Sequence, residues 1–260
     1  MNTRSRAFPA PLRGIRAAFV FLTRIPVGGF PYRAADYAWA SAHAPLVGFI
    51  VGGLTGGAAA ILAPLGALPA SFLALGVSML ATGAFHEDGL ADTSDALGGA
   101  SDRDRLFAIL KDSRIGSFGA AALVVSIGTR ATLLAELGAR APWAMALAGC
   151  CARVAPIWLL AALPYVSPDG AAKSHGVARG GPVQAVVATL WGVLAVSVAE
   201  TDHVLDRARS GVLALTLLVV AGVTGARYRA RAGGVTGDLL GATEQLGEVA
   251  TLAALAWGVR

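Results

Sequence analysis

The sequence predicts an all-helical membrane protein with six to seven transmembrane helices in one bundle, and a single domain over residues 1–260. Hydrophobic residues make up 55% of the chain and charged residues only 14%, whereas soluble domains carry about 25% charged residues. The mean hydropathy is +0.64, which indicates apolar segments of the roughly 20 residues that cross a bilayer. The lipid bilayer is therefore the expected environment of the chain.

The first segment, residues 1–27, is basic at its start and then apolar. Arg24 and Pro26 interrupt the apolar run and no small-residue cleavage site follows, which argues against a removed signal peptide. A short amphipathic or re-entrant helix near the membrane surface is expected instead.

Seven apolar segments follow, each close to the length of a membrane span. Glycines within them, as in VGFIVGGLTGG, allow helices in lipid to approach closely. The last segment begins with the polar run ATEQLGEV and is the weakest candidate. The predicted spans are residues 42–63, 68–85, 117–136, 142–164, 182–200, 210–226 and 242–258.

The charges of the connecting segments predict the orientation, because cytoplasmic loops carry an excess of Lys and Arg. With the N-terminus in the cytoplasm, segments 86–116 and 227–241 emerge together on the cytoplasmic face. The same bias accounts for the net charge of +5, so nucleic acid is not an expected partner. The basic residues on the cytoplasmic side would be Arg4, Arg6, Arg13, Arg16, Arg24, Arg33, Arg103, Arg105, Lys111, Arg114, Lys173, Arg179, Arg227, Arg229 and Arg231, against Arg140, Arg207, Arg209 and Arg260 on the other.

An acidic segment, FHEDGLADTSDALGG, follows the second predicted span. Asp88, Asp92 and Asp95 are spaced i, i+4 and i+7, so on a helix they share one face. Grouping three like charges is unfavourable unless a cation binds, and Mg²⁺ is often held by a few carboxylates together with substrate phosphates. His86 and Glu87 could serve as a second shell or as a base. A solvated acidic loop is the alternative interpretation.

Two further segments have residues suited to phosphate. Lys111, Asp112 and Arg114 precede the third span, and Lys and Arg bind phosphate well. The run GGVTGD, with Thr236 and Asp238, opens the last predicted helix, where backbone amides suit a phosphate and an Asp suits a metal. It lacks the Gly-Lys-Ser/Thr ending of a Walker A loop.

Charged residues also fall within the predicted spans. An Arg at a helix centre costs about 2.5–3.5 kcal/mol on insertion scales, so Arg130 and Arg153 should each face a carboxylate, a polar cavity or an anionic ligand. Glu244 and Glu248 lie one turn apart on the last segment. Carboxylates within a span are candidates for function, although an interfacial position for Glu248 is the alternative.

Three of these segments, HEDGLADTSDALGG, LKDSRIGSFGA and GGVTGDLLGATEQLGE, resemble the signature blocks of the cobamide (cobalamin) synthase family, in the family's order. FLTRIPV near the N-terminus resembles the family's opening block. The resemblance implies a Mg²⁺-dependent, multi-pass enzyme of the bacterial inner membrane with a cytoplasmic active site. It would join adenosylcobinamide-GDP to α-ribazole or its 5′-phosphate, with attack of a ribose hydroxyl on the phosphorus attached to cobinamide and release of GMP.

The resemblance and the residue patterns together give the expected site. The catalytic candidates are His86, Asp88, Lys111, Asp112 and Arg114. The substrate-binding candidates are Ser113, Arg114, Gly234, Thr236, Gly237 and Arg153. The metal-ligand candidates are Asp88, Asp92, Asp95 and Asp238. The two substrates and the bilayer are the expected partners, and a homo-oligomer is left open.

Other classes of membrane protein fit the pattern less well. CDP-alcohol phosphotransferases also begin an Asp-rich helix with Asp-Gly, but their spacing differs from that around Asp92 and Asp95. Ubiquinone-type prenyltransferases need a second Asp-rich motif. A transporter would use midplane residues, whereas the carboxylates here gather near one face.

Overall fold

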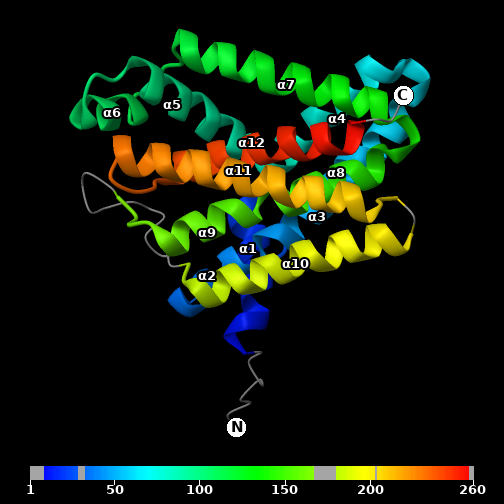
Figure 1. The fold of residues 1–260 in the computed structure, drawn as a ribbon, viewed down its shortest axis with the longest axis horizontal. Coiled ribbons are helices and arrows are strands. Elements are labelled where there is room, and N and C mark those ends of the chain that lie inside the picture. Colours follow the sequence, from blue (N-terminus) through cyan, green and yellow to red (C-terminus); the bar gives the residue numbers. More distant parts are fainter. Residues whose placement is uncertain (1–8, 29–32, 167–179, 203, 258–260) are drawn as a thin grey trace.

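The computed structural model describes residues 9–28, 33–166, 180–202 and 204–257. Over these residues the chain is built of α-helices with short 3₁₀ turns and without β-strands, apart from one isolated bridge between Tyr165 and Val235. Long helices lie side by side, with α12 (Gly237–Ala256) at the centre (Figure 1). The all-helical prediction is confirmed.

The N-terminal segment forms the predicted amphipathic helix, α1 (Ala10–Leu22). Its buried residues are Gly14, Ala17, Ala18 and Leu22, and a Cβ atom added at Gly14 would lie 2.5 Å from the Cβ atom of Trp39. This close contact joins α1 to α2 (Ala34–Ala40), where Arg13 also pairs with Asp36 at 2.7 Å. The position of α1 relative to a membrane surface stays a prediction.

Glycines set the close packing of α3 (Ala44–Leu62) on α8 (Ala141–Ala152). A Cβ atom at Gly48 or Gly52 would lie 2.0 Å from a carbonyl oxygen of α8. Only glycine permits such an approach, and small residues play this part in membrane helix pairs.

The second predicted span is α4 (Ala67–Thr82), and the acidic segment after it is a helix in its own right, α5 (Phe85–Gly99). The chain turns by 95° between them, because Gly83 and Ala84 both adopt left-handed conformations with φ of 74° and 56°. This turn lays α5 across one end of α12 (Figure 1). A short helix, α6 (Arg103–Leu110), follows.

The remaining predicted spans also contain helices. They are α7 (Ser117–Leu137), α8 continued by α9 (Val154–Ala162), α10 (Pro182–Thr201), α11 (Arg207–Arg231) and α12. By length and composition, four helical stretches of the described residues could cross a membrane, or up to five if α4 and α5 count as one bent span.

This count is lower than the predicted six to seven, for two physical reasons. One stretch, Ser117–Ala162, has 46 residues, about 69 Å of helix and twice the thickness of a bilayer core. The chain turns back within it at Gly138, where φ is 52°, so it contains two predicted spans. The other difference is α12, the central helix, because Glu244, Gln245 and Glu248 make it less apolar than the helices in this count.

Segments 86–116 and 227–241 meet at one end of the bundle, at the left in Figure 1. Arg231 Nη2 donates a hydrogen bond of 2.6 Å to the carbonyl oxygen of Ala100. Their predicted location on one face is confirmed, and its cytoplasmic orientation stays a prediction. Of the charges used in that prediction, Arg4, Arg6, Lys173, Arg179 and Arg260 lie outside the described residues.

Candidate functional site

The site is organised by the contact between α5 and the start of α12. A Cβ atom added at Gly89 would lie 2.9 Å from the carbonyl oxygen of Asp238 and 3.3 Å from the Cα atom of Gly241. The two backbones therefore touch, and a larger residue at Gly89 would push them apart.

This contact gathers three carboxylates, which we call the acidic patch: Asp88, Asp92 and Asp238. Asp88 is exposed, whereas Asp92 and Asp238 are half-buried. The negative charges of Asp88 and Asp238 both act on Asp92, and within the described residues no Lys or Arg forms an ion pair with any of the three. A cluster of like charges without a cationic partner is electrostatically unfavourable and attracts cations.

Asp95, the fourth predicted metal ligand, has a structural partner that the sequence did not indicate. Its two carboxylate oxygens accept hydrogen bonds from the backbone N–H groups of Gly116 (2.7 Å) and Gly119 (2.9 Å). Asp95 is buried and caps the N-terminus of α7. The geometry favours the acidic patch over Asp95 as the source of metal ligands.

The cap brings the basic segment to the acidic patch. Gly116 is tied to Asp95, which lies one helical turn beyond Asp92. The segment before it holds Lys111, Ser113 and Arg114, all exposed. The three signature segments of the sequence thus come together at one end of the bundle.

Arg114 is bonded to Asp112 through its Nε and Nη2 atoms, at 2.9 and 2.7 Å. These bonds from the Arg114 guanidinium lower the pKa of Asp112 to about 2. Asp112 is therefore anionic at neutral pH and a weak base, so the structure favours a role for it in holding Arg114. The side chain of Arg114 is 86% exposed, which leaves the rest of its guanidinium open to an anion.

The glycine-rich turn has structural roles that the sequence analysis did not separate from substrate binding. A Cβ atom at Gly234 would lie 2.1 Å from the carbonyl oxygen of Pro164, so this position requires glycine for packing. Thr236 is the N-cap of α12 and its Oγ1 atom accepts a hydrogen bond from Leu239 N at 3.3 Å. Gly237 is the first residue of α12 and lines a cavity described below.

A Mg²⁺ ion fits this donor set only in part. Hard cations take oxygen ligands and Mg²⁺ usually binds one or two carboxylates, waters and substrate phosphates. The acidic patch supplies carboxylates with unbalanced charge. However, no three His, Cys, Asp or Glu side chains of the described chain form a ready metal cage. The arrangement suits an ion that arrives with a phosphate ligand.

Beneath the acidic patch lies a buried ionic network of two Arg and three Glu side chains. Arg130, only 1% exposed, contacts Glu248 at 2.8 Å and Glu87 at 3.1 Å. Arg153 contacts Glu244 at 2.7 Å and Glu248 at 3.4 Å. The expectation that both Arg residues face carboxylates is confirmed. Glu248 is buried between the helices, and its depth in the membrane stays a prediction.

His86 belongs to this network and not to the acidic patch. It precedes Asp88 by two positions, and side chains so spaced leave a helix about 200° apart. Its Nδ1 atom lies 3.4 Å from Nη2 of Arg153, a cation that can only donate, so this contact assigns the ring proton to Nε2. In this tautomer the Nε2–H group of His86 is a hydrogen-bond donor, and the two suggested roles of His86, in a second shell or as a base, stay predictions.

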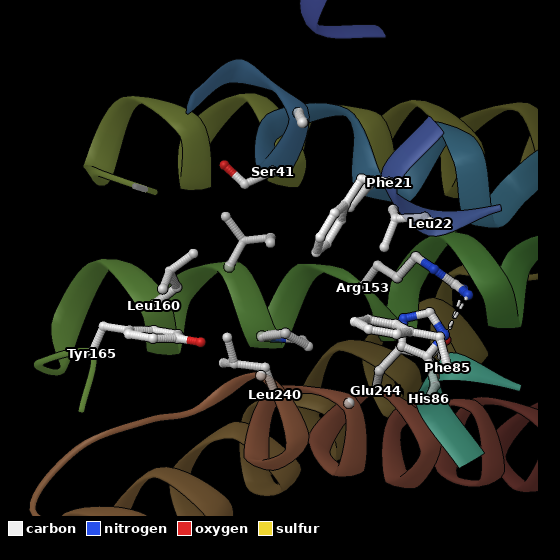
Figure 2. A pocket seen from close by; sticks show the side chains of 16 residues that line it. Phe21, Leu22, Ser41, Phe85, His86, Arg153, Leu160, Tyr165, Leu240 and Glu244 are labelled. Atoms are coloured by element: carbon white, nitrogen blue, oxygen red, sulfur yellow. Dashed lines mark hydrogen bonds and ion pairs between the residues drawn. The ribbon is translucent and has the colours of Figure 1, made fainter. Parts of the chain in front are cut away.

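An open cavity with about 690 Å³ of empty space, its mouth included, lies beside the network (Figure 2). Its walls come from α1, α3, α5, α9 and α12, and most of them are apolar. Arg153, His86 and Glu244 gather at one end, and Tyr165 lies at the other. This cavity could not be predicted from the sequence, because its apolar wall residues are indistinguishable from core residues.

Comparison with known proteins finds relatives over most of the chain. Residues 14–256 match the model of a family described as cobalamin-5-phosphate synthase. The chain is similar to proteins named adenosylcobinamide-GDP ribazoletransferase, at 41% identity in Leptothrix cholodnii and 39% in Bradyrhizobium diazoefficiens. These alignments cover 92% of this chain, and 92% and 91% of the two relatives. The relative from Azorhizobium caulinodans is 40% identical over 93% of this chain and 94% of its own. No solved structure matches the chain.

Proposed function

Because this chain belongs to the cobalamin-5-phosphate synthase family and is a transferase of cobalamin synthesis, we propose that it joins adenosylcobinamide-GDP to α-ribazole, or to α-ribazole 5′-phosphate, at the acidic patch. One observation carries the proposal. Residues 88–116 and 234–238, more than 100 residues apart in the chain, meet at one end of the bundle, with carboxylates of α5 and α12 beside the basic segment that precedes α7.

The reaction is a substitution at phosphorus. A ribose hydroxyl oxygen forms a bond to the phosphorus attached to cobinamide, and the bond from this phosphorus to the bridging oxygen breaks. GMP leaves with the electron pair of that bond. The hydroxyl proton passes to a carboxylate of the acidic patch, for which exposed Asp88 is the candidate.

The residues of the proposed site have two kinds of role: some bind charged groups, and others hold those residues in position. Lys111 and Arg114 bind the diphosphate, with Asp112 holding Arg114 in place. Asp88, Asp92 and Asp238 would hold Mg²⁺. When bound, the ion offsets the charge of the phosphate oxygens. The buried network fixes α5 against α12, so that carboxylates from both helices stay at one place.

The experiment measures GMP release from adenosylcobinamide-GDP and α-ribazole by the purified protein in lipid nanodiscs, over a range of Mg²⁺ concentrations. Replacing Asp88, Asp92 or Asp238 with Asn should lower turnover sharply and raise the Mg²⁺ concentration needed for half-maximal rate. Asp104→Asn, on exposed α6, is the matched control and should keep the normal Mg²⁺ requirement. Normal rates and normal Mg²⁺ dependence in all three variants would exclude the acidic patch as the metal site.

We place this end of the bundle in the cytoplasm and the protein in the bacterial inner membrane, on the charge bias of the loops. Cys150 and Cys151 are both buried, so single exposed cysteines can be labelled selectively. In intact cells, an impermeant thiol reagent should label Thr201→Cys, at the opposite end, and spare Ser101→Cys. Labelling of Ser101→Cys alone would reverse the orientation.

A further inference from the structure

The cavity beside the buried network has a composition that restricts what it can bind. Phe21 and Phe85 form an edge-to-face pair with ring centroids 5.6 Å apart, and both line the cavity together with Ile157, Leu160 and Leu240. Such walls favour a flat apolar or aromatic body.

Charge at the polar end excludes an anion. Both guanidinium groups of the network are paired with Glu side chains: Arg130 with Glu87 and Glu248, and Arg153 with Glu244 and Glu248. No positive charge is left to balance a phosphate. The diphosphate of the first substrate therefore belongs outside, at the acidic patch and the basic segment.

One buried donor at this end lacks a partner. Arg153 is 5% exposed, and its Nε–H group makes no hydrogen bond with any described residue. Its Nη1 atom donates to Gly149 O at 2.6 Å, and Nη2 contacts His86. Glu244 Oε1 at the same end also lacks a hydrogen bond but is ion-paired with Arg153 Nη1 at 2.7 Å. Because buried donors are almost always satisfied, a neutral acceptor is needed beside Arg153 Nε.

We propose that this cavity binds the aromatic base of the ribazole acceptor, with the unsubstituted ring nitrogen accepting a hydrogen bond at the Arg153 end. The base of α-ribazole is a benzimidazole, a flat apolar bicycle with one ring nitrogen free after ribose is attached. It supplies both the apolar body and the single neutral acceptor. The proposal rests on the proposed function, since it assigns a place to the second substrate of that reaction.

The position of the cavity also determines in which direction the ribose of the bound ribazole would point. Gly237 and Gly241 of α12 line its wall, Asp238 follows Gly237, and Gly241 packs against His86 and Gly89 of α5. A riboside with its base inside would therefore extend along the start of α12 toward the acidic patch, where the hydroxyl reacts.

Cavity filling on α12 tests the assignment. Leu240→Trp places bulk in the cavity, and Leu246→Trp, on the same helix but 43% exposed, is the matched control. We expect Leu240→Trp to raise KM for α-ribazole at least tenfold while KM for adenosylcobinamide-GDP changes less than twofold, and Leu246→Trp to leave both unchanged. Thermal unfolding of both variants verifies that they are folded.

A ligand series tests the hydrogen bond without changing the protein. The riboside of the indole that matches the benzimidazole base has a CH group in place of the free ring nitrogen. Loss of a hydrogen bond to a charged donor should weaken its binding about tenfold or more relative to α-ribazole, measured by calorimetry with the wild-type protein. Equal affinities would overturn the assigned contact.

The two proposals fail in different ways. If the wild-type protein releases no GMP from adenosylcobinamide-GDP with α-ribazole and Mg²⁺, the proposed function is wrong. If it turns over normally but the two Trp variants have the same KM for α-ribazole, or Leu240→Trp raises both KM values equally, only the assignment of the cavity is wrong.

Discussion

The substitution Asp95→Asn tests whether Asp95 is a structural cap of α7 or a metal ligand like its neighbours on α5. Both oxygens of Asp95 accept N–H bonds from the start of α7, at 2.7 and 2.9 Å. An Asn side chain keeps one acceptor, and its NH₂ group would face the second backbone N–H. Hydrogen bonds to charged groups contribute about 1.5–3 kcal/mol, and a negative charge at a helix N-terminus about 0.3–1 kcal/mol. We expect Asp95→Asn to lower the free energy of unfolding by about 2–4 kcal/mol.

Asp92→Asn is the matched comparison, because it makes the same change one turn earlier. Asp92 lies among like charges, so neutralising it relieves repulsion and should leave stability nearly unchanged. Its effect should fall on turnover and on the Mg²⁺ requirement instead.

Two measurements on the same nanodisc samples decide between the roles: unfolding by heat or denaturant, and GMP release against Mg²⁺ concentration. Asp95→Asn should be less stable, with reduced turnover through displacement of the basic segment but a normal Mg²⁺ midpoint. The capping argument is refuted if Asp95→Asn is as stable as the wild type and shifts the Mg²⁺ midpoint as far as Asp92→Asn does.

Three further predictions concern the buried ionic network, the basic segment and the contact between α5 and α12. Arg130→Met leaves buried carboxylates unpaired and should cost about 3–5 kcal/mol, while the double variant with Glu248→Gln should lose less than the sum of the single losses in an unfolding cycle; strict additivity would argue against the ion pair. Arg114→Ala should raise KM for the GDP substrate roughly tenfold or more by removing a charge-assisted contact, with unchanged unfolding; unaltered kinetics would make Arg114 a membrane-flanking charge. Gly89→Ala should reduce turnover, because its Cβ atom would meet α12 backbone at 2.9 Å, whereas Gly241→Ala, with neighbours at 3.5 Å or more, should be tolerated; equal activities would show that the helix contact is not critical.

The helices could be predicted from the sequence because a helix in lipid needs a long run of mostly apolar residues. Each of the seven apolar segments contains a helix, and the buried partners of Arg130 and Arg153 followed from the cost of an unpaired charge. The meeting of segments 86–116 and 227–241 at one end followed from the charge bias of the loops.

Side-chain roles within those segments could not be predicted, because they depend on packing between helices. The i, i+4, i+7 spacing gives Asp88, Asp92 and Asp95 one face, but it does not reveal that α7 meets that face at Asp95. In the same way, His86 and Asp88 are near in sequence yet lie on opposite sides of α5. A helix that contacts partners on two sides presents different chemistry to each, and only the partners identify which residue serves which side.

The turn between α4 and α5 explains why a cluster of carboxylates directly follows an apolar span. Two left-handed residues at the end of α4 turn α5 across the bundle, so its acidic face reaches the end of the bundle while Glu87 reaches the buried network. Helix α5 thus contributes carboxylates both to the acidic patch and to the buried ionic network. Central α12 repeats this division, with Asp238 at its first turn and Glu244 and Glu248 inside. Both helices carry residues of the acidic patch and residues of the buried ionic network. A shift at the buried ion pairs must therefore also move the carboxylates of the acidic patch, so the reaction there depends on packing within the bundle.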